Sequence, residues 1–281
     1  MSEIEIGIVG AGGRMGRMLV EAVSASPGCR LVSASEHPDS EHIGRDAGEV
    51  AGIATTGVPI QKNAMMTFDS SQVVIDFTLP KATLSHLELA RKSGTPMVIG
   101  TTGFNNADLE KISAVAERMP IVMAPNYSIG VNLMFKVAAE VADVIGRDFD
   151  IEIIEAHHRH KVDAPSGTAL GLGKAIADAV HRNLGEVAIY GREGVTGTRN
   201  RRTIGFSTIR GGDIVGDHTA LFAGEGERLE ITHKASSRMT FAKGAVRAAQ
   251  WVLGRGPGLF DMQDILGFRQ KTSSMKPNIV Y

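Results

Sequence analysis

Short apolar runs alternate with segments of helical periodicity along the first half of the chain, and this alternation constrains the fold more than any other feature. The apolar run Ile4–Val9 ends in a glycine, and residues 15–24 that follow have apolar side chains at helical spacing. The same order returns in extended stretches at 30–35, 73–77, 97–99 and 121–124, with helical stretches at 81–92 and 106–118. Such alternation predicts βαβ units on a parallel sheet, and therefore an α/β fold.

The pattern changes after residue 128. A helix is predicted over 129–145, and a single further helix, at 168–184, lies among four predicted strands at 150–156, 203–210, 214–223 and 228–234. That mixture predicts an α+β domain with a more open, mixed sheet. Because helical periodicity returns at 239–253, we expect residues 1–128 and 239–281 to form one domain and residues 129–238 to be inserted as the second.

A glycine-rich turn joins the first strand to the first helix. Bare backbone there can approach a pyrophosphate at the helix amino terminus, where N–H groups favour anions. The third glycine of the strict G-x-G-x-x-G pattern comes one position late, at Gly16. Glu36 ends the second strand about 20 residues further on, where an acid can accept hydrogen bonds from ribose hydroxyls. The alternative is a plain glycine turn with a surface glutamate. The predicted cofactor-binding residues of the turn are Gly10, Ala11, Gly12, Gly13, Arg14 and Met15.

Two more loops follow predicted strands of the same sheet. Ligands of open α/β sheets bind outside the carboxyl ends of the strands, so these loops should border the nicotinamide part of the crevice. Taken alone, each loop could equally be a plain turn. Their residues are Gly100, Thr101, Thr102, Ala124, Pro125, Asn126 and Tyr127.

A histidine-rich segment lies where a strand gives way to a helix. Three histidines, His157, His158 and His160, stand beside Arg159 and Lys161. A metal site is one interpretation, but fixed positive charges beside the histidines and the absence of an H-E-x-x-H pattern oppose it. A solvated basic loop is another. The third is an anion-binding catalytic pocket, with imidazoles and an ammonium as proton donors and a helix amino terminus for a carboxylate.

Strand geometry bears on that pocket. If 157–161 were extended, His157, Arg159 and Lys161 would share one face and His158 would point the other way. We therefore expect the strand to end here and the loop to rotate His158.

The run E-I-x-E-x-H-x-x-x-K-x-D-x-P-S-G-T-A, present from Glu152 to Ala169, resembles the signature of the 4-hydroxy-tetrahydrodipicolinate (dihydrodipicolinate) reductase family. The glycine turn and the two later loops resemble that family's cofactor loops in the same order. The resemblance implies reduction of a cyclic, unsaturated dicarboxylate to tetrahydrodipicolinate by NADH or NADPH, in lysine and diaminopimelate synthesis. It implies a Rossmann-type doubly wound domain that binds the dinucleotide, and a second domain that binds substrate and builds a homotetramer. His157 and Lys161 match the family's proton donors, His158 a substrate contact, and Gly167 and Thr168 the backbone site for a substrate carboxylate.

The preference between the two cofactors depends on the residues after the acid. Some family members carry arginine there, where it can meet the 2′-phosphate of NADPH, whereas this chain has His37 followed by Pro38 and Asp39. Glu36 favours NADH, and His37 could still contact a phosphate. We expect NADH to be preferred, with use of both possible.

Composition excludes several other classes. With 30 Lys+Arg against 31 Asp+Glu, the formal net charge of −1 gives no global attraction to nucleic acid or an anionic membrane. The single cysteine, Cys29, excludes an intramolecular disulfide. The acidic amino terminus and the lack of a long apolar run lead us to expect a cytoplasmic protein. No bound metal is expected, for the reasons given for the histidine-rich segment.

Three competing hypotheses stay open at this point: an aspartate or homoserine dehydrogenase-like reductase, a nicotinamide-sensing regulatory module, and a histidine metalloenzyme. Other polar residues have plainer interpretations. His218 and His233 are interpreted as hydrogen-bonded residues of a sheet face. Arg199, Arg201 and Arg202 are interpreted as part of a solvated loop, with a place at the border of the substrate entrance as the alternative.

Overall fold

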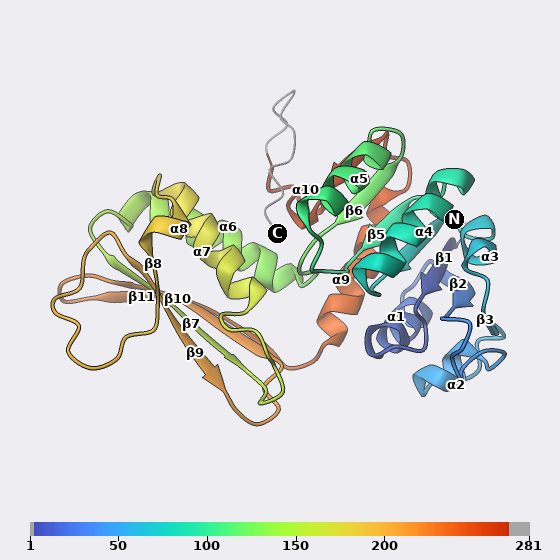
Figure 1. Ribbon diagram of the computed structural model, residues 1–281, viewed down its shortest axis with the longest axis horizontal. Helices are drawn as coiled ribbons and strands as arrows, with labels where there is room; N and C mark the ends of the chain where they lie inside the picture. Colours follow the sequence, from blue (N-terminus) through green and yellow to red (C-terminus); the bar gives the residue numbers. More distant parts are fainter. Residues whose placement is uncertain (1–2, 270–281) are drawn as a thin grey trace. The chain divides into compact units, whose positions relative to one another are not determined.

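The computed structural model describes residues 3–269. Contacts divide the chain into two compact units, one containing residues 3–128 and 239–269 and the other residues 129–238. In Figure 1 the first unit contains the blue to green segment and the later helix α9 (Met239–Val252). The last part of the predicted first domain, residues 270–281, lies outside the described residues.

The first unit is built on a seven-stranded sheet in which every neighbouring pair is parallel. The strand order is β12-β6-β5-β4-β1-β2-β3. The strands are β1 (Ile4–Val9), β2 (Cys29–Ser35), β3 (Ile60–Gln61), β4 (Val73–Asp76), β5 (Met97–Ile99), β6 (Pro120–Met123) and β12 (Gly258–Phe260). This is the predicted Rossmann-type doubly wound sheet, and the order reverses between β1 and β4, where such sheets bind their ligands.

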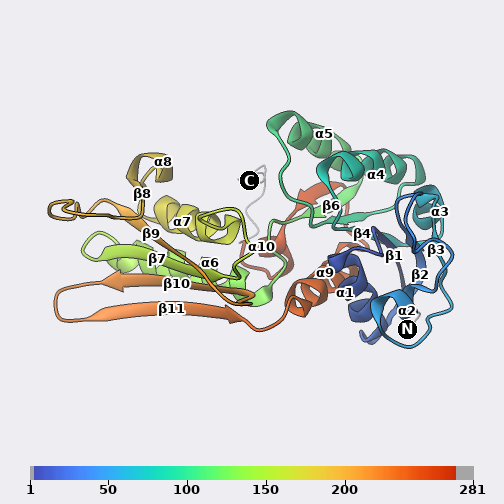
Figure 2. The same ribbon diagram turned by 60° about the horizontal axis from the view of Figure 1, so that its bottom comes forward.

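Both faces of this sheet are covered, which is why its strands read as continuous apolar runs. Ile6 and Ile8 of β1 pack in one core with helices α1 and α9, while Val9 and Val74 pack in another with α4 and α5. Figure 2 shows these two helix layers on opposite sides of the strands. The helices are α1 (Arg14–Ser24), α2 (Ala47–Ala51), α3 (Ala64–Asp69), α4 (Pro80–Ser93), α5 (Asn106–Ala116), α9 and α10 (Met262–Ile265).

The second unit has a five-stranded mixed sheet in the order β11-β10-β7-β9-β8. The central strand β7 pairs parallel with β9 and antiparallel with β10. One face is covered by helices, because Ile151 and Ile153 of β7 pack with Leu172 and Ile176 of α7. The elements are α6 (Ile129–Ile145), β7 (Asp150–His157), α7 (Gly167–Ala179), α8 (Leu184–Val187), β8 (Ala188–Tyr190), β9 (Ile204–Arg210), β10 (Gly216–Ala223) and β11 (Arg228–Ala235). The predicted α+β architecture with a mixed sheet is confirmed.

The structure corrects the predicted helix at 168–184. It ends at Ala179, because His181 adopts a φ of +55° that a right-handed helix does not allow. Asn183 then caps the separate short helix α8 through its side chain, which accepts a hydrogen bond from the Gly185 N–H. Among the helices of residues 3–269, none has the length and apolar character needed to cross a membrane.

Candidate functional site

The glycine turn after β1 fits a dinucleotide phosphate. Gly10 has a φ of +70°, and a Cβ on Gly16 would overlap the Gly10 carbonyl oxygen, so both positions need glycine. Helix α1 begins at Arg14, which is exposed. Within the described chain, the N-cap residue Gly13 makes no side-chain capping hydrogen bond, and the first turn of α1 holds no acidic residue. The N–H groups at this helix end are therefore suited to an external anion.

Glu36 lies beside the turn. One of its carboxylate oxygens accepts a hydrogen bond from the Gly12 N–H at 2.9 Å and the other from the His37 N–H at 2.8 Å. The structure therefore brings the predicted ribose-binding acid to the glycine turn, although 24 residues separate it from Gly12. His37 itself is exposed, and its Nδ1 lies 3.7 Å from the Asp39 carboxylate.

The loop after β4 belongs to the same edge of the sheet and was not among the predicted site residues. Thr78 donates its N–H to the Thr101 hydroxyl at 3.0 Å, and a Cβ on Gly10 would lie 2.5 Å from the Thr78 methyl group. Asp76, fully buried, accepts from the Thr78 hydroxyl and contacts His86 Nδ1 at 2.8 Å. The signal was available, because this loop also follows a predicted strand.

Hydrogen bonds and ring contacts connect the loops after β5 and β6. Tyr127 is buried, and its hydroxyl donates to the Ile99 carbonyl at 2.8 Å, at the end of β5. The Phe77 ring lies 5.3 Å from the Tyr127 ring, and a Cβ on Gly100 would overlap the Phe77 ring. Thr102 and Pro125 are exposed. The loops after β1, β4, β5 and β6 are thus in contact, each with the next, at the carboxyl ends of the strands.

In the second unit, a buried polar cluster forms at the end of β7. His157 Nδ1 lies 2.6 Å from a carboxylate oxygen of Glu155, which is 1% exposed. Arg210, at the end of β9, donates to both oxygens of that carboxylate, at 2.7 and 2.8 Å. The strand ends at His157, as expected, and the His158 N–H donates to the Ile214 carbonyl.

The amino terminus of α7 joins this cluster. The Ser166 N–H donates to Glu155 at 3.0 Å, and its hydroxyl caps the helix by accepting from the Ala169 N–H. His218 of β10 is 3% exposed and contacts the same hydroxyl through Nε2 at 3.0 Å. The interpretation of His218 as a hydrogen-bonded residue of the sheet is confirmed.

Two cations stand near the ends of the histidine-rich segment. Lys161 Nζ lies 2.8 Å from the Asp163 carboxylate. Arg238, which follows β11, donates to His158 Nε2 at 3.2 Å. Sequence reasoning missed Arg238, because only the pairing of β11 with β10, and of β10 with β7, brings it beside a histidine 80 residues earlier.

Burial and hydrogen bonding set the charges of this cluster. Burial alone would raise the pKa of Glu155, but hydrogen bonds from Arg210, His157 and the Ser166 N–H lower it to about 2. Burial lowers the pKa of His157 below its usual value although the Glu155 carboxylate opposes that shift, and burial lowers the pKa of His218 to about 3. At neutral pH the cluster therefore holds an ionised Glu155 beside neutral imidazoles.

Comparisons with known proteins agree over residues 4–127 and 130–266. The family model described as "Dihydrodipicolinate reductase, N-terminus" matches residues 4–127, and the one described as "Dihydrodipicolinate reductase, C-terminus" matches residues 130–266. The chain belongs to the dihydrodipicolinate reductase family. A 4-hydroxy-tetrahydrodipicolinate reductase of Magnetococcus marinus is 65% identical over 95% of this chain and 99% of its own length. One of Methylococcus capsulatus is 59% identical over the same shares.

A solved structure has the same fold. The dipicolinate-bound dihydrodipicolinate reductase of Paenisporosarcina sp. TG-14 is 27% identical, with a TM-score of 0.73 over 92% of this chain and 97% of that one. The predicted activity is therefore confirmed: the protein is an oxidoreductase, a nicotinamide-dependent reductase of 4-hydroxy-tetrahydrodipicolinate in lysine and diaminopimelate biosynthesis.

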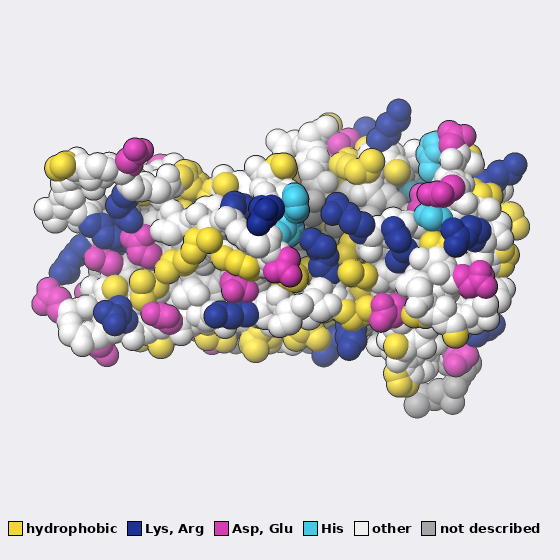
Figure 3. All heavy atoms as spheres, turned by 90° about the horizontal axis from the view of Figure 1, so that it is seen from below, with side chains coloured by type: hydrophobic (Ala, Val, Ile, Leu, Met, Phe, Trp, Pro, Cys, Tyr) yellow, Lys and Arg dark blue, Asp and Glu magenta, His cyan; other side chains and the backbone are white. Residues whose placement is uncertain are grey.

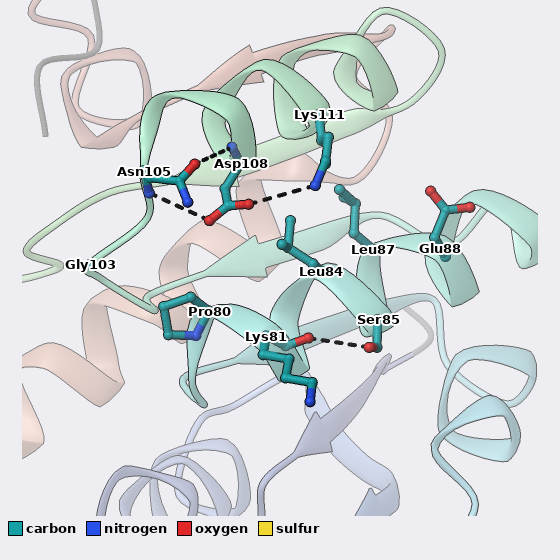
Figure 4. Close-up of a pocket in the computed structure, with 10 residues that line it drawn as sticks. All are labelled: Pro80, Lys81, Leu84, Ser85, Leu87, Glu88, Gly103, Asn105, Asp108 and Lys111. Carbon is teal, nitrogen blue, oxygen red and sulfur yellow. Dashed lines mark hydrogen bonds and ion pairs between the residues drawn. The ribbon is translucent and has the colours of Figure 1, made fainter.

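An open groove of about 690 Å³ on the first unit is separate from all of these residues. It lies between α4 and α5, and Figure 4 shows that its polar side chains pair locally: Asn105 with Asp108, Asp108 with Lys111, and Ser85 with the Lys81 carbonyl. The groove holds none of the predicted site residues of this reductase family member.

Metal-ligating side chains and surface charge bear on two of the predictions. Among residues 3–269, no three or more His, Cys, Asp or Glu side chains are grouped so that they could hold a metal ion. On the face that Figure 3 shows, acidic and basic side chains are interspersed, with histidines beside lysines and arginines.

The interpretation of Arg199 as solvated is wrong: its side chain is 19% exposed and donates to Glu152 at 2.9 Å and to Asp150 at 2.6 Å.

Proposed function

We propose that the unit containing residues 3–128 and 239–269 binds the dinucleotide and that residues 129–238 bind and protonate the cyclic dicarboxylate. The observation that carries this proposal is the cluster that joins His157, through Glu155, to the amino terminus of α7, with the Lys161 charge acting on His157. A reduced nicotinamide, when bound, supplies the hydride. The glycine turn fits its pyrophosphate because Gly10 and Gly16 cannot carry side chains and the first turn of α1 has no acidic residue.

The substrate carboxylates need donors. At the start of α7, a Cβ on Gly167 would meet nothing within 4 Å, so a ligand carboxylate has room to approach the Gly167 and Thr168 N–H groups. The Arg238–His158 pair provides a cation and an imidazole for a second carboxylate. Two anionic groups of one ring would then be held by two different parts of the same unit.

Hydride addition leaves an electron pair on the ring that a proton must neutralise. The Lys161 ammonium and the protonated form of the His157 imidazole are the two groups that can supply this proton. Because burial lowers the pKa of His157 below its usual value, the neutral form of this imidazole predominates at neutral pH. Lys161 therefore carries the proton that is transferred at neutral pH, and His157 exchanges protons through Nε2.

Replacing each proton donor tests this assignment. We expect His157→Ala and Lys161→Ala each to lower turnover by about 10²-fold or more, the usual scale for a lost general acid. The assay supplies the condensation product of pyruvate and aspartate semialdehyde and follows oxidation of the nicotinamide by absorbance. Circular dichroism and thermal unfolding check that both variants fold. Turnover close to wild type in either variant would remove that residue from the mechanism.

For the cofactor, we propose that NADH is preferred and NADPH is also used. Glu36 supports this, because its carboxylate lies at the glycine turn, can accept from ribose hydroxyls and repels a 2′-phosphate. The measurement is kcat/KM for both cofactors. Glu36→Gln should raise the NADPH-to-NADH ratio by about tenfold, equivalent to about 1.4 kcal/mol. A strong NADPH preference of the wild-type protein would contradict the proposal.

We also propose that the protein is a cytoplasmic homotetramer. The sheet of the second unit supports the assembly, because its helices cover only one face. Apolar side chains also point to the uncovered face, and one of them, Ile209, is 51% exposed. A second copy of the chain would bury that open face.

A further inference from the structure

The carboxylate of Glu155 connects three separate parts of the polar cluster. It contacts His157 of its own strand, Arg210 of the neighbouring strand β9, and the Ser166 N–H at the start of α7. Arg210 also donates to the Asp163 carbonyl at 2.6 Å, in the loop that carries Lys161. A single buried carboxylate thus fixes a histidine, a helix amino terminus and a loop.

We infer that Glu155 is a positioning residue of the reductase: it holds the proton of neutral His157 on Nδ1, so that Nε2 is the atom that exchanges protons, and with Arg210 it holds that imidazole in register with Lys161 and the α7 amino terminus. The inference rests on the proposed role of His157 in proton transfer. Glu155 is not itself proposed to touch the substrate.

The direction of the hydrogen bonds leads to this conclusion. An ionised carboxylate can only accept, so the 2.6 Å contact requires a proton on His157 Nδ1. A neutral imidazole has one proton, which leaves Nε2 with its lone pair. Gly216 lies on that side, where a Cβ would be 3.0 Å from Nε2. Glycine at this position therefore leaves Nε2 clear of a neighbouring side chain.

The charged and titratable groups around His157 come from its own strand, from the strands on either side and from the following loop. Glu155 lies on its own strand, Arg210 on β9 and Lys161 in the following loop. From β10, the His218 ring stands edge-on at 5.1 Å, with His233 of β11 beyond it. Glu155 is the anion among these groups, so it alone favours the protonated form of His157.

An amide cannot replace this carboxylate. Oε2 of Glu155 receives hydrogen bonds from His157 Nδ1 and Arg210, while Oε1 receives them from Arg210 and the Ser166 N–H. In Glu155→Gln, the amide NH₂ group takes the place of one of the two accepting oxygens. If the NH₂ group faces His157, it donates to Nδ1, so Nδ1 must be the acceptor. The proton of the imidazole then moves to Nε2.

The chain offers a matched control in Glu152. This residue lies on the same strand and is bridged by two arginines, Arg192 at 2.8 Å and Arg199 at 2.9 Å. It alternates with Glu155 along the strand and so points to the opposite face of the sheet. Glu152→Gln therefore removes an arginine-bridged carboxylate of the same strand without touching the cluster. Because Glu152 lies on the face assigned to the tetramer interface, the mass of this variant is checked by sedimentation velocity.

The test combines NMR with kinetics. Two-bond ¹⁵N–¹H spectra of the histidine-labelled protein, assigned with His157→Gln, should show Nδ1 protonated in wild type and in Glu152→Gln, and Nε2 protonated in Glu155→Gln. We expect kcat to fall by about 10²-fold in Glu155→Gln, as for a misplaced reacting group, and by less than about twofold in Glu152→Gln. The limb of the kcat/KM profile that follows His157 should move to lower pH only in Glu155→Gln.

Two results would overturn the inference: Nε2 protonated in the wild-type protein, or a Glu155→Gln variant with an unchanged kcat and pH profile. If Glu155→Gln does not fold, Glu155→Asp keeps the charge but withdraws it by one methylene, and a kcat like that of wild type would again contradict the inference. The NMR result is obtained without substrate. It is therefore independent of the turnover of His157→Ala. An unchanged turnover of that variant would count against His157 as a proton donor, but not against the contact between Glu155 and His157.

Discussion

At the scale of single residues, the burial of uncharged histidine makes stability depend on pH. His218 has its pKa lowered to about 3 by burial, whereas an unfolded chain restores about 6.5. Below pH 6.5 the unfolded state binds more protons, so stability falls as the pH falls. From pH 7 to 5 this one group should cost about 2 kcal/mol of the free energy of unfolding. Urea unfolding at pH 7 and pH 5 measures this loss of unfolding free energy. In His218→Gln the loss should be smaller than in wild type by about 2 kcal/mol. The exposed His160, changed to Gln, is the control, and an equal decrease in all three proteins would contradict the prediction.

The same residues mark what sequence reasoning could and could not reach. His157 and Lys161 were predictable because they lie in one short segment with a recognisable pattern. Glu155 lies two positions before His157, and the period of a strand alone could have placed both on one face. Arg210 and Arg238 could not be found in this way, since their contacts with Glu155 and His158 depend on which strands pair.

At the scale of elements, the packing of α9 against a loop outweighs helix propensity. Gly244 lies inside α9, where alanine would favour the helix by up to about 1 kcal/mol. A Cβ there would overlap the Tyr127 carbonyl oxygen, which is backbone that cannot easily move. We expect Gly244→Ala to lose about 1–3 kcal/mol, as in other overpacked cores, and to lower Tm by several degrees. Gly185→Ala, at an exposed position of α8, is the control with an unchanged or higher Tm. A Gly244→Ala variant as stable as wild type would show that the contact can relax.

Elements differed in how well the sequence predicted them. Long buried strands and amphipathic helices, such as α6, have a period that the sequence displays directly. The strands β3, β8 and β12 have only two or three residues, too few for any period, and form because an existing sheet edge provides their hydrogen bonds. The break after Ala179 depends on one residue with positive φ, and His181 gives no such signal in the sequence.

At the scale of the whole molecule, the second unit leaves one face of its sheet without helices. Residues that alternate with the helix-packed ones, such as Ile154, Leu221 and Thr232, line this face, and Thr219 and Thr232 are bonded across it through their hydroxyls at 2.9 Å. Sheets that face water are usually polar on that side, whereas this one mixes isoleucine and leucine with charged residues. The pattern fits a surface that a second copy covers in the proposed tetramer.

That assembly gives the last prediction. Thr232 is exposed on β11, so an arginine there can reach water in a single chain, but in a symmetric interface each copy would bury an arginine against its partner. In sedimentation velocity, the wild-type protein should have four times the mass of one chain, and Thr232→Arg should shift to dimers or monomers while keeping its circular dichroism. Val144→Arg, at a position that is 79% exposed on α6, should stay tetrameric. A monomeric wild type would refute the tetramer. A tetrameric Thr232→Arg would instead place the interface on another surface.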